Sequence, residues 1–498
     1  MTAWLPRVEG CFVPVVHSKC PHNEITAISL RSLSAVPEQT SMPLPAHTVR
    51  VWHSLTRFVR KYQDGAWSHR RTAESYSGAL GRRYGEAATS LEVDGPSGFA
   101  DYYLRAFLKV EKSRVPFKMA KPRLIYPRSP RYNLELASRL KPFEHWLWGR
   151  LNGKLFRCGD GSRVVAKGLN ARQRANLIVR KFRAIEDCVC VEVDGKSFES
   201  HVGVPQLKRE FGVYKAAFPG DKRLSWLLSK QLKLEGTLEC GARFSREGGR
   251  ASGDFNTGMG NSLIFLVECV SAARQLGIHY DILVDGDNAV LFCSSRDYPL
   301  LRDHFAENVV NSSGHEVSVD SVATCIEEIR FGGSAPVNLG ALGWTMVRDW
   351  VRVLSGAFSS HIHLRHPKFA KEWMTGVAMC ELSCSKGVPI LQKWALSAID
   401  ALGHTGKIRP DFYRDFYARG AWLAGRDYQA TVTDVARLSF ERAFGVNPEQ
   451  QLQIENSFES SLKDLGHYAA DFSFYDPETF EEYLTFDELH LDWRRARE

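Results

Sequence analysis

An acidic turn between two apolar runs is the stretch of this sequence best suited to chemistry. Ile282 to Val284 and Ala289 to Phe292 are apolar and rich in β-branched residues, and Asp285-Gly286-Asp287-Asn288 separates them. This pattern predicts a β-hairpin with a tight turn. The turn clusters carboxylate and amide oxygens, which hard divalent cations prefer as ligands. An EF-hand loop fits poorly, because its glycine and closing glutamate are missing. The alternative interpretation is a solvated hairpin turn that binds no ligand.

A second acidic pair lies upstream of this turn. Cys188 to Val193 predicts a short strand that ends at Asp194, and Glu199 follows five residues later, past the strand. An acid at the end of a strand lies at a sheet edge where ligands bind. Together with the acidic turn, it would supply a minimal protein clamp for two magnesium ions.

A glycine-rich loop runs into an apolar helix between Gly248 and Val267. Thr257 and Asn261 are four residues apart, so both project from one face of the helix. Ser252 and Gly253 lie in the preceding loop, where a hydroxyl and an adaptable backbone suit a sugar or a phosphate. A nucleophile elbow would need a Gly-x-Ser-x-Gly pattern, which this loop lacks.

A basic segment with several prolines spans Ala106 to Lys141. The prolines predict extended backbone in place of helix. Repeated cations on a stiff segment would line a site for triphosphate or backbone phosphate, and arginine adds bidentate geometry. An exposed basic loop is the alternative. The cations of this segment include Lys112, Lys121, Arg123, Arg128 and Arg131.

Length and charge agree with a large protein that contacts a polyanion. The chain has 498 residues, is 44% hydrophobic and carries a formal net charge of +8. The 52 residues from Asn447 to Glu498 hold 13 acidic and 4 basic side chains, so the preceding residues carry about +17. A basic body is compatible with nucleic acid but does not prove it. The acidic end could fold back over a basic channel and gate entry of a template.

Cysteine usage and hydropathy narrow the cellular setting. Eleven cysteines are scattered without paired spacing, which predicts reduced thiols in a cytosolic protein. Cys11, Cys20 and His22 lack the second half of a zinc site. The sequence has no long apolar run and no signal-peptide pattern, so we expect membrane association only through a partner or a surface patch.

Two other regions are informative about organisation. From Val49 to Ala88, basic residues alternate with aromatic residues, a pattern that fits single-stranded nucleic acid and fits an ordinary packed helix pair equally well. Residues from Trp350 to Phe444 read mostly as helices, with candidate starts at Pro367 and Pro389.

Taken in order, these stretches resemble motifs F, A, B and C of viral RNA-dependent RNA polymerases. The motifs are the basic segment, Asp-x4-acid, Ser-Gly-x3-Thr-x3-Asn and Gly-Asp-Asn. The strongest likeness is to the tombusvirus-like replicases of positive-strand RNA viruses, whose basic motif is nearly reproduced from Pro122 to Asn133. Phe331 to Val337 is similar to their motif E, and the likeness covers roughly Val49 to Leu354.

The resemblance implies an α+β right-hand polymerase fold with an antiparallel palm sheet and a largely helical thumb. It places N-terminal and fingers elements at 1–100, fingers with the basic motif at 101–185, and the palm at 186–348 with a finger insertion at about 205–248. The helical thumb would span 349–446 and the acidic, aromatic segment 447–498.

By resemblance, Asp194 and Asp287 ligate two Mg²⁺ ions, and Asn288 can donate a further oxygen. Glu199, Ser252, Gly253, Thr257 and Asn261 would read the ribose. The basic residues named above would hold the triphosphate and the RNA backbone. The implied partners are template and product RNA, nucleoside triphosphates and a viral or host membrane-anchoring replication protein. The implied location is the host cytoplasm, at membrane-associated replication complexes.

Three residues depart from the family pattern. Asn288 replaces the second aspartate of Gly-Asp-Asp, as in non-segmented negative-strand polymerases, which predicts weaker metal binding and a shift toward Mn²⁺. Glu199 replaces an aspartate, which puts sugar selectivity in doubt. The lysine expected near Glu316 to Val319 is missing, so the general acid for pyrophosphate release is unassigned. His315 is one candidate for this role, and the alternative is that it is a structural histidine at the surface.

The resulting hypothesis is an RNA-dependent RNA polymerase that replicates a viral RNA genome by template-directed, two-metal nucleotidyl transfer. The alternative is a catalytically weakened polymerase fold that serves as an RNA-binding or replication-complex scaffold, which Asn288 and Glu199 motivate. A reverse transcriptase is a third possibility, disfavoured by the Ser-Gly-x3-Thr-x3-Asn pattern.

Overall fold

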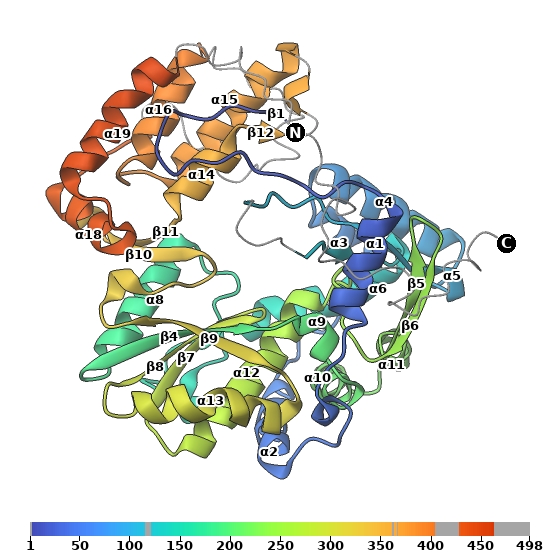
Figure 1. Cartoon of the computed structure of the whole chain (residues 1–498). Helices are drawn as coiled ribbons and strands as arrows, with labels where there is room; N and C mark the ends of the chain where they lie inside the picture. The colour runs from blue at the N-terminus through green and yellow to red at the C-terminus, as the bar shows by residue number, and fades with distance from the viewer. Residues whose placement is uncertain (1, 115–120, 361–362, 366, 404–427, 463–498) are drawn as a thin grey trace.

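The described part of the chain contains two four-stranded sheets packed with helices, two two-stranded sheets and a C-terminal group of helices (Figure 1). This computed structural model describes residues 2–114, 121–360, 363–365, 367–403 and 428–462. Helices and antiparallel sheets occur together, as the α+β class requires.

The first sheet contains the predicted acidic hairpin. Its strand order is β7-β8-β4-β9, and each neighbouring pair is antiparallel. The hairpin and the strand that ends near Asp194 are therefore confirmed, and they are direct neighbours. The bounds are β4 Cys188–Gly195, β7 Tyr280–Asp285, β8 Asn288–Ser294 and β9 Val317–Ala323.

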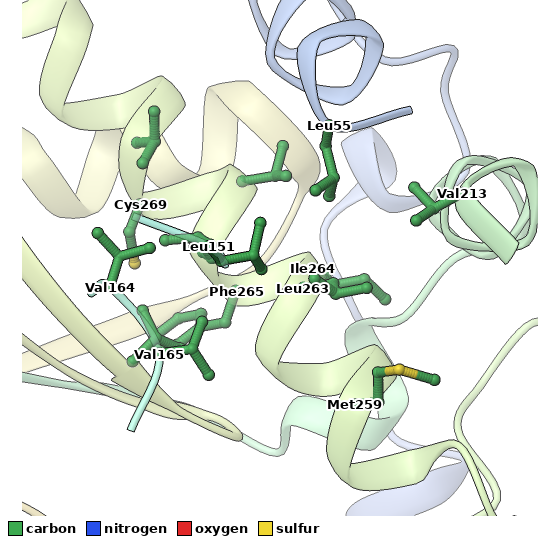
Figure 2. Close-up of a cluster of buried hydrophobic side chains, with 14 of the residues drawn as sticks. Leu55, Leu151, Val164, Val165, Val213, Met259, Leu263, Ile264, Phe265 and Cys269 are labelled. Carbon is green, nitrogen blue, oxygen red and sulfur yellow. The ribbon is translucent and has the colours of Figure 1, made fainter. Parts of the chain in front are cut away.

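Both faces of this sheet are covered, because its strands are apolar on both sides. One face packs on the group of helices that surrounds α12, and the other packs on α8. Figure 2 shows Leu263 and Phe265 of α12 among side chains from other segments, including Leu55 of α2 and Val213 of α10. The bounds are α2 Ala46–Val59, α8 Ala171–Arg183, α10 Val204–Ala217, α12 Thr257–Leu276 and α13 Tyr298–Ser313.

The second sheet has the order β3-β2-β5-β6. Leu104, Ala106 and Leu108 alternate on its inner face and pack against Ile25 and Ile28, as the two-residue period of a strand requires. The bounds are β2 Leu104–Leu108, β3 Leu124–Ile125, β5 Lys233–Leu238, β6 Arg243–Glu247, α1 Pro21–Ala27 and a π-helix Ile28–Ser32.

The expectation of extended backbone across the basic segment is wrong from Pro130 onward. Helix α6 (Pro130–Trp148) begins there, and the Ser129 side chain caps it by accepting from the Tyr132 N–H. Proline suits the first turn of a helix, where its missing N–H leaves no bond unmade. Residues 115–120 of this segment lie outside the described residues.

The aromatic residues between Val49 and Ala88 belong mainly to the core. Trp52, Tyr62 and Tyr84 are buried, which favours the packing alternative over a nucleic-acid surface. The remaining helices of this half are α3 His69–Glu74, α4 Gly78–Val93, α5 Phe99–Tyr102, α7 Gly153–Phe156, α9 Phe198–His201 and α11 Lys222–Ser229.

The C-terminal part is a small hairpin followed by helices, in agreement with the sequence. Its acidic end is partly structural, because Phe458 and Leu462 are buried in the helical core. The proposed gating by that end falls mainly on residues 463–498, which lie outside the described residues. The bounds are β10 Ser334–Asn338, β11 Trp344–Arg348, α14 Trp350–Ala357, α15 Pro367–Cys384, α16 Leu391–Ala401, α18 Asp434–Phe444 and α19 Pro448–Ser461.

The first 33 residues connect the C-terminal helices to the second sheet. Strand β1 (Thr2–Ala3) pairs with β12 (Ser359–Ser360), and Trp4 packs in the helical core. The chain then passes a bridge between Val15 and Ser113 before α1 reaches the second sheet. Figure 1 shows this path in dark blue. The N-terminal segment, which matched no motif, thus joins the two parts.

All eleven cysteines are unpaired thiols, as their spacing predicted. Within the ranges described above, the helices are too short or too polar to cross a bilayer.

A buried ion pair beneath the first sheet generates a stability prediction. Lys181 Nζ and Asp281 Oδ1 are 2.7 Å apart, with side chains 0% and 1% exposed. Asp281→Ala would leave a buried, unpaired ammonium, so we expect a loss of about 3–5 kcal/mol in the free energy of unfolding. Denaturant unfolding measures this loss.

Two controls separate this effect from a general sensitivity to substitution. The double variant Lys181→Met, Asp281→Leu should regain most of the stability, because no charge stays buried. Glu92→Ala removes one partner of the Arg70–Glu92 pair, whose side chains are 48% and 51% exposed, and should cost about 1 kcal/mol or less. A fully stable Asp281→Ala protein would contradict the account.

Candidate active site

The predicted acidic turn and the end of β4 meet in the structure. Asp194 is directly opposite Asn288 in the β4–β8 pairing, and the Gly195 N–H donates to the Asp287 carbonyl at 2.9 Å. Asp194 is exposed and Asp287 is half-buried. The two aspartates that the sequence singled out thus project from neighbouring positions at one edge of the sheet.

Two glycines make this meeting possible. Gly286 and Asp287 form a two-residue turn, and Gly286 has φ +69°, as a type II′ hairpin turn requires at its first central position. At Gly195, a Cβ would lie 2.8 Å from the Phe198 ring. Any side chain there would force apart the strand end and the helix that carries Glu199.

Helix α12 holds the acidic turn in place through a side-chain hydrogen bond. The Gly286 N–H donates to Ser262 Oγ at 2.9 Å. Ser262 itself donates to the carbonyl of Gly258, so the helix and the turn are joined by consecutive hydrogen bonds.

Asn288 is held so that its oxygen stays available. Its Nδ2 donates to Glu192 Oε1 at 3.0 Å. Among the described residues, its Oδ1 is buried without a hydrogen-bond partner. A buried acceptor without a partner is costly, so this atom fits a position that a ligand would occupy.

Glu199 and Arg123 complete the charged centre. Glu199 lies in α9, and Arg123 Nη2 is 3.9 Å from its Oε1. Burial raises the pKa of the Asp287 carboxyl, and the charge of Glu199 raises it further, whereas Arg123 and Lys167 oppose that rise. The centre therefore holds excess negative charge that a cation would offset.

Two cations beside the turn were missed from the sequence. Lys167 Nζ and Arg174 Nη2 each lie 2.7 Å from a carboxylate oxygen of Asp285. They come from a loop and a helix more than 100 residues away in sequence, and no local pattern marks them. They hold the first residue of the acidic turn and leave Asp287 for other ligands.

The glycine-rich loop rests on a buried polar network. Arg250 pairs with Glu210 and also donates to Asn261 Oδ1 at 3.0 Å. Glu210 accepts from Asn256 Nδ2 at 2.9 Å. A Cβ at Gly260 would collide with this pair, so the glycine allows close packing there. The sequence interpretation missed the network because the residues that bond to each other are 11 to 46 positions apart.

The predicted ribose-reading residues converge beside this network. Thr257 begins α12 as predicted, and its Oγ1 donates to the Ala251 carbonyl at 2.8 Å. Ser252 Oγ donates to the Leu124 carbonyl at 3.3 Å. Gly253 lies against the backbone of Tyr126, where a Cβ would not fit. The loop is therefore packed on the edge strand β3, which lies between Arg123 and Arg128 in the sequence.

The assignment of Arg128 to phosphate binding is wrong. Its side chain is 2% exposed and bonds to Asp254 Oδ1 at 2.6 Å. A guanidinium with a buried partner cannot reach an RNA strand without breaking that pair. Its role is to fasten the glycine-rich loop to the basic segment.

Of the other basic residues in this segment, some bond to protein groups and one is exposed to solvent. Arg131 donates to the Gly95 carbonyl at 2.8 Å and pairs with Asp101, so its side chain is engaged within the protein. Lys112 donates to the carbonyl of Gly356 at 2.7 Å and lines a cavity of about 450 Å³ beside α14. Lys121 is exposed. Arg123 is therefore the basic residue held directly at the acidic centre.

His315 is neither a surface histidine nor placed as a general acid. Its side chain is 0% exposed, and Nδ1 lies 2.7 Å from Glu268 Oε1. Proton transfer to a leaving group needs contact with that group, which a fully enclosed ring does not have. His315 belongs to the core beneath α9.

No group of three or more His, Cys, Asp or Glu side chains in the described ranges is arranged around one point as a metal site. Mg²⁺ is commonly held by one or two carboxylates together with water and substrate phosphates. Two aspartates and one amide oxygen match that smaller requirement.

Comparisons with known proteins agree with the geometry. The chain is similar to the RNA-directed RNA polymerase of Carnation mottle virus, with 33% identity over 78% of this chain and 50% of the relative. It is 29% identical to the polymerase of Red clover necrotic mosaic virus over 91% of this chain and 60% of the relative. The enzyme of Tobacco necrosis virus (strain A) is 30% identical, over 83% of this chain and 57% of the relative.

The chain therefore spans about half to three fifths of the length of these relatives. The family model described as viral RNA-dependent RNA polymerase matches residues 8–463, which include the acidic turn, the glycine-rich loop and the C-terminal helices. On this match, the chain belongs to the viral RNA-dependent RNA polymerase family.

Proposed function

We propose that the chain is a template-directed RNA polymerase that transfers nucleotides from ribonucleoside triphosphates to the 3′-hydroxyl of a growing RNA. The observation that carries the proposal is the pairing of the end of β4 with the acidic turn, which sets Asp194 opposite Asn288 and next to Asp287. Family membership supports the same reaction. Replication of a viral RNA genome, in host cytoplasm and at membranes reached through a partner protein, is part of the proposal.

A right-hand arrangement is the architecture that this reaction suggests. The first sheet with α12 and α13 would be the palm, within 186–348. The second sheet and the helices before residue 185 would be the fingers, with an insertion at about 205–248, and the helices of 349–446 the thumb. Fingers and thumb would then be joined by the N-terminal segment described above.

The acidic centre fits divalent metal ions. Asp194, Asp287 and the Oδ1 of Asn288 would hold them, as the partnerless buried oxygen and the raised pKa of Asp287 indicate. Bound Mg²⁺ or Mn²⁺ would activate the 3′-hydroxyl and neutralise charge on the triphosphate.

The residues of the chain would position the reactants. Arg123 is 37% exposed, so its guanidinium can turn from Glu111 and Glu199 to the phosphates with bidentate geometry. Lys121 and Lys112 would add charge along the same edge. This would leave Glu199 free to accept a hydrogen bond from the ribose 2′-hydroxyl, which separates ribonucleotides from deoxyribonucleotides.

The loop before α12 would complete the ribose site. Ser252, Thr257 and Asn261 each already bond within or beside the loop, so their positions are set before a nucleotide arrives. Such preorganisation lowers the cost of ordering the site on binding. Gly253 would let the nucleotide approach the backbone closely.

Nucleotide incorporation on a short single-stranded RNA tests the proposed reaction. We expect incorporation by the native chain and at least a hundredfold loss in Asp287→Ala, equivalent to about 2.7 kcal/mol of transition-state stabilisation. Asn288→Asp should raise the rate with Mg²⁺ relative to Mn²⁺, because a second charge binds the harder ion more strongly.

Binding of the same RNA serves as the comparison. If RNA bound but neither metal supported incorporation, the chain would be an RNA-binding scaffold and the catalytic proposal would be wrong. Equal use of deoxyribonucleotides would contradict the ribose site.

The raised pKa of Asp287 gives a test without substrate. A carboxyl whose pKa is raised on folding destabilises the folded state increasingly as pH rises from its ordinary pKa to the raised one, and the full penalty applies above that. Asp287→Asn should therefore raise the unfolding temperature of metal-free protein at pH 7.5, and the gain should shrink as pH falls toward 4.

Asp285→Asn is the matched control, because Asp285 is paired with two cations. This neighbouring change should lower the unfolding temperature at pH 7.5. A lower unfolding temperature for both variants would show that Asp287 carries no unfavourable charge.

A further inference from the structure

The outer face of β2 carries alternating aromatic and cationic side chains. Leu104, Ala106 and Leu108 point to the buried inner face, so Arg105 and Phe107 lie on the opposite face. The extended residue before the strand and the residue after it continue this alternation, giving the β2 stripe of Tyr103, Arg105, Phe107 and Lys109. Along a strand, residues two apart are about 6.6 Å apart.

One end of the β2 stripe reaches the candidate active site. The Lys109 N–H donates to the Arg123 carbonyl at 2.7 Å. Lys109 pairs with Glu111, and Arg123 lies 3.5 Å from the same carboxylate. Arg123 in turn faces Glu199 at 3.9 Å. A strand of RNA on this face would therefore lead directly to the acidic centre.

The other end is open and aromatic. Phe99 is 70% exposed, and its ring stacks on Tyr103 with centroids 6.4 Å apart and planes at 27°. Phe107 is half-buried, so part of its ring is accessible. Core packing alone does not account for so exposed a phenylalanine beside Tyr103, the first residue of the β2 stripe.

Arg105 supplies a cation that the protein does not use. It is exposed, and it makes no side-chain hydrogen bond or ion pair with the residues in the described ranges. Aromatic faces that alternate with cations are the composition of single-stranded nucleic-acid sites, because bases stack on rings while phosphates contact cations. Duplex RNA would not present its base faces for such stacking.

We propose that the β2 stripe holds the uncopied, single-stranded part of the RNA template before it reaches the acidic centre. Bases would stack on Phe107 and on the Phe99–Tyr103 pair, and phosphates would contact Arg105 and Lys109. The inference rests on the proposed function and deepens it by assigning the template path. It predicts affinity for overhangs with little sequence preference.

The test compares two fluorescent primer–template RNAs without nucleotides. One has a 5′ template overhang of about six nucleotides, and the other is blunt. The native chain should prefer the overhang. Phe107→Ala should weaken overhang binding about fivefold or more, which corresponds to the loss of one stacked base. Arg105→Gln should reduce the slope of log affinity against log salt by about 0.7. Blunt-duplex binding should not change.

Arg302→Gln is the matched control, because it removes an exposed arginine of α13, outside the second sheet. Arg302→Gln should leave the preference for overhang RNA over blunt RNA unchanged. Since Phe107→Ala removes a partly packed ring, unfolding temperatures accompany the binding data, and Arg105→Gln tests the path without touching the core.

Unchanged overhang affinity in both β2 variants, or equal losses for overhang and blunt RNA, would overturn the template path. A native chain that shows no preference for the overhang would do the same. Normal nucleotide incorporation together with unchanged overhang binding would reject the path alone. Overhang binding that depends on β2 without any incorporation would support the path and reject the polymerase proposal.

Discussion

The antiparallel pairing of β4 with the β7–β8 hairpin is the constraint on which the site depends. It sets Asp194 opposite Asn288, and the bond from Gly195 to the Asp287 carbonyl closes the pairing at its edge. A slip of one residue would turn every side chain of the strand to the other face. Because both faces of the sheet are packed in separate cores, such a slip would expose buried apolar residues. Core packing therefore fixes the geometry of the two aspartates.

Around this pairing, ion pairs hold the acidic residues of the neighbouring loops. Asp285 is occupied by Lys167 and Arg174, Asp254 by Arg128, and Glu210 by Arg250. At Asp287, burial and the charge of Glu199 raise the pKa of the carboxyl, although Arg123 and Lys167 oppose that rise. A site that carries unfavourable negative charge in the free protein favours cations. A bound metal ion would remove this unfavourable electrostatic energy, which would strengthen its binding.

The sequence predicted what depends on local pattern and missed what depends on distant partners. The hairpin at Asp285 to Asn288 and the helix that starts at Thr257 follow from period and turn chemistry, and the structure contains both. Arg128 looked like a phosphate ligand because its charge is visible in sequence, whereas its burial against Asp254, 126 residues away, is not. The burial of His315 against Glu268 is likewise invisible in the local sequence, which suggested a surface position. Lys167 carries no motif at all, and only folding brings it to the turn.

Binding of Mn²⁺ tests most directly the central claim that the acidic turn and the end of β4 together form a metal site. Electron paramagnetic resonance of Mn²⁺ titrated into the native chain, with and without a nonhydrolysable nucleoside triphosphate, gives both stoichiometry and affinity. We expect weak binding alone, stronger binding with the triphosphate, and loss of both in Asp194→Ala and in Asp287→Ala, since substrate phosphates complete such sites. Native-like Mn²⁺ binding in either variant would contradict the account.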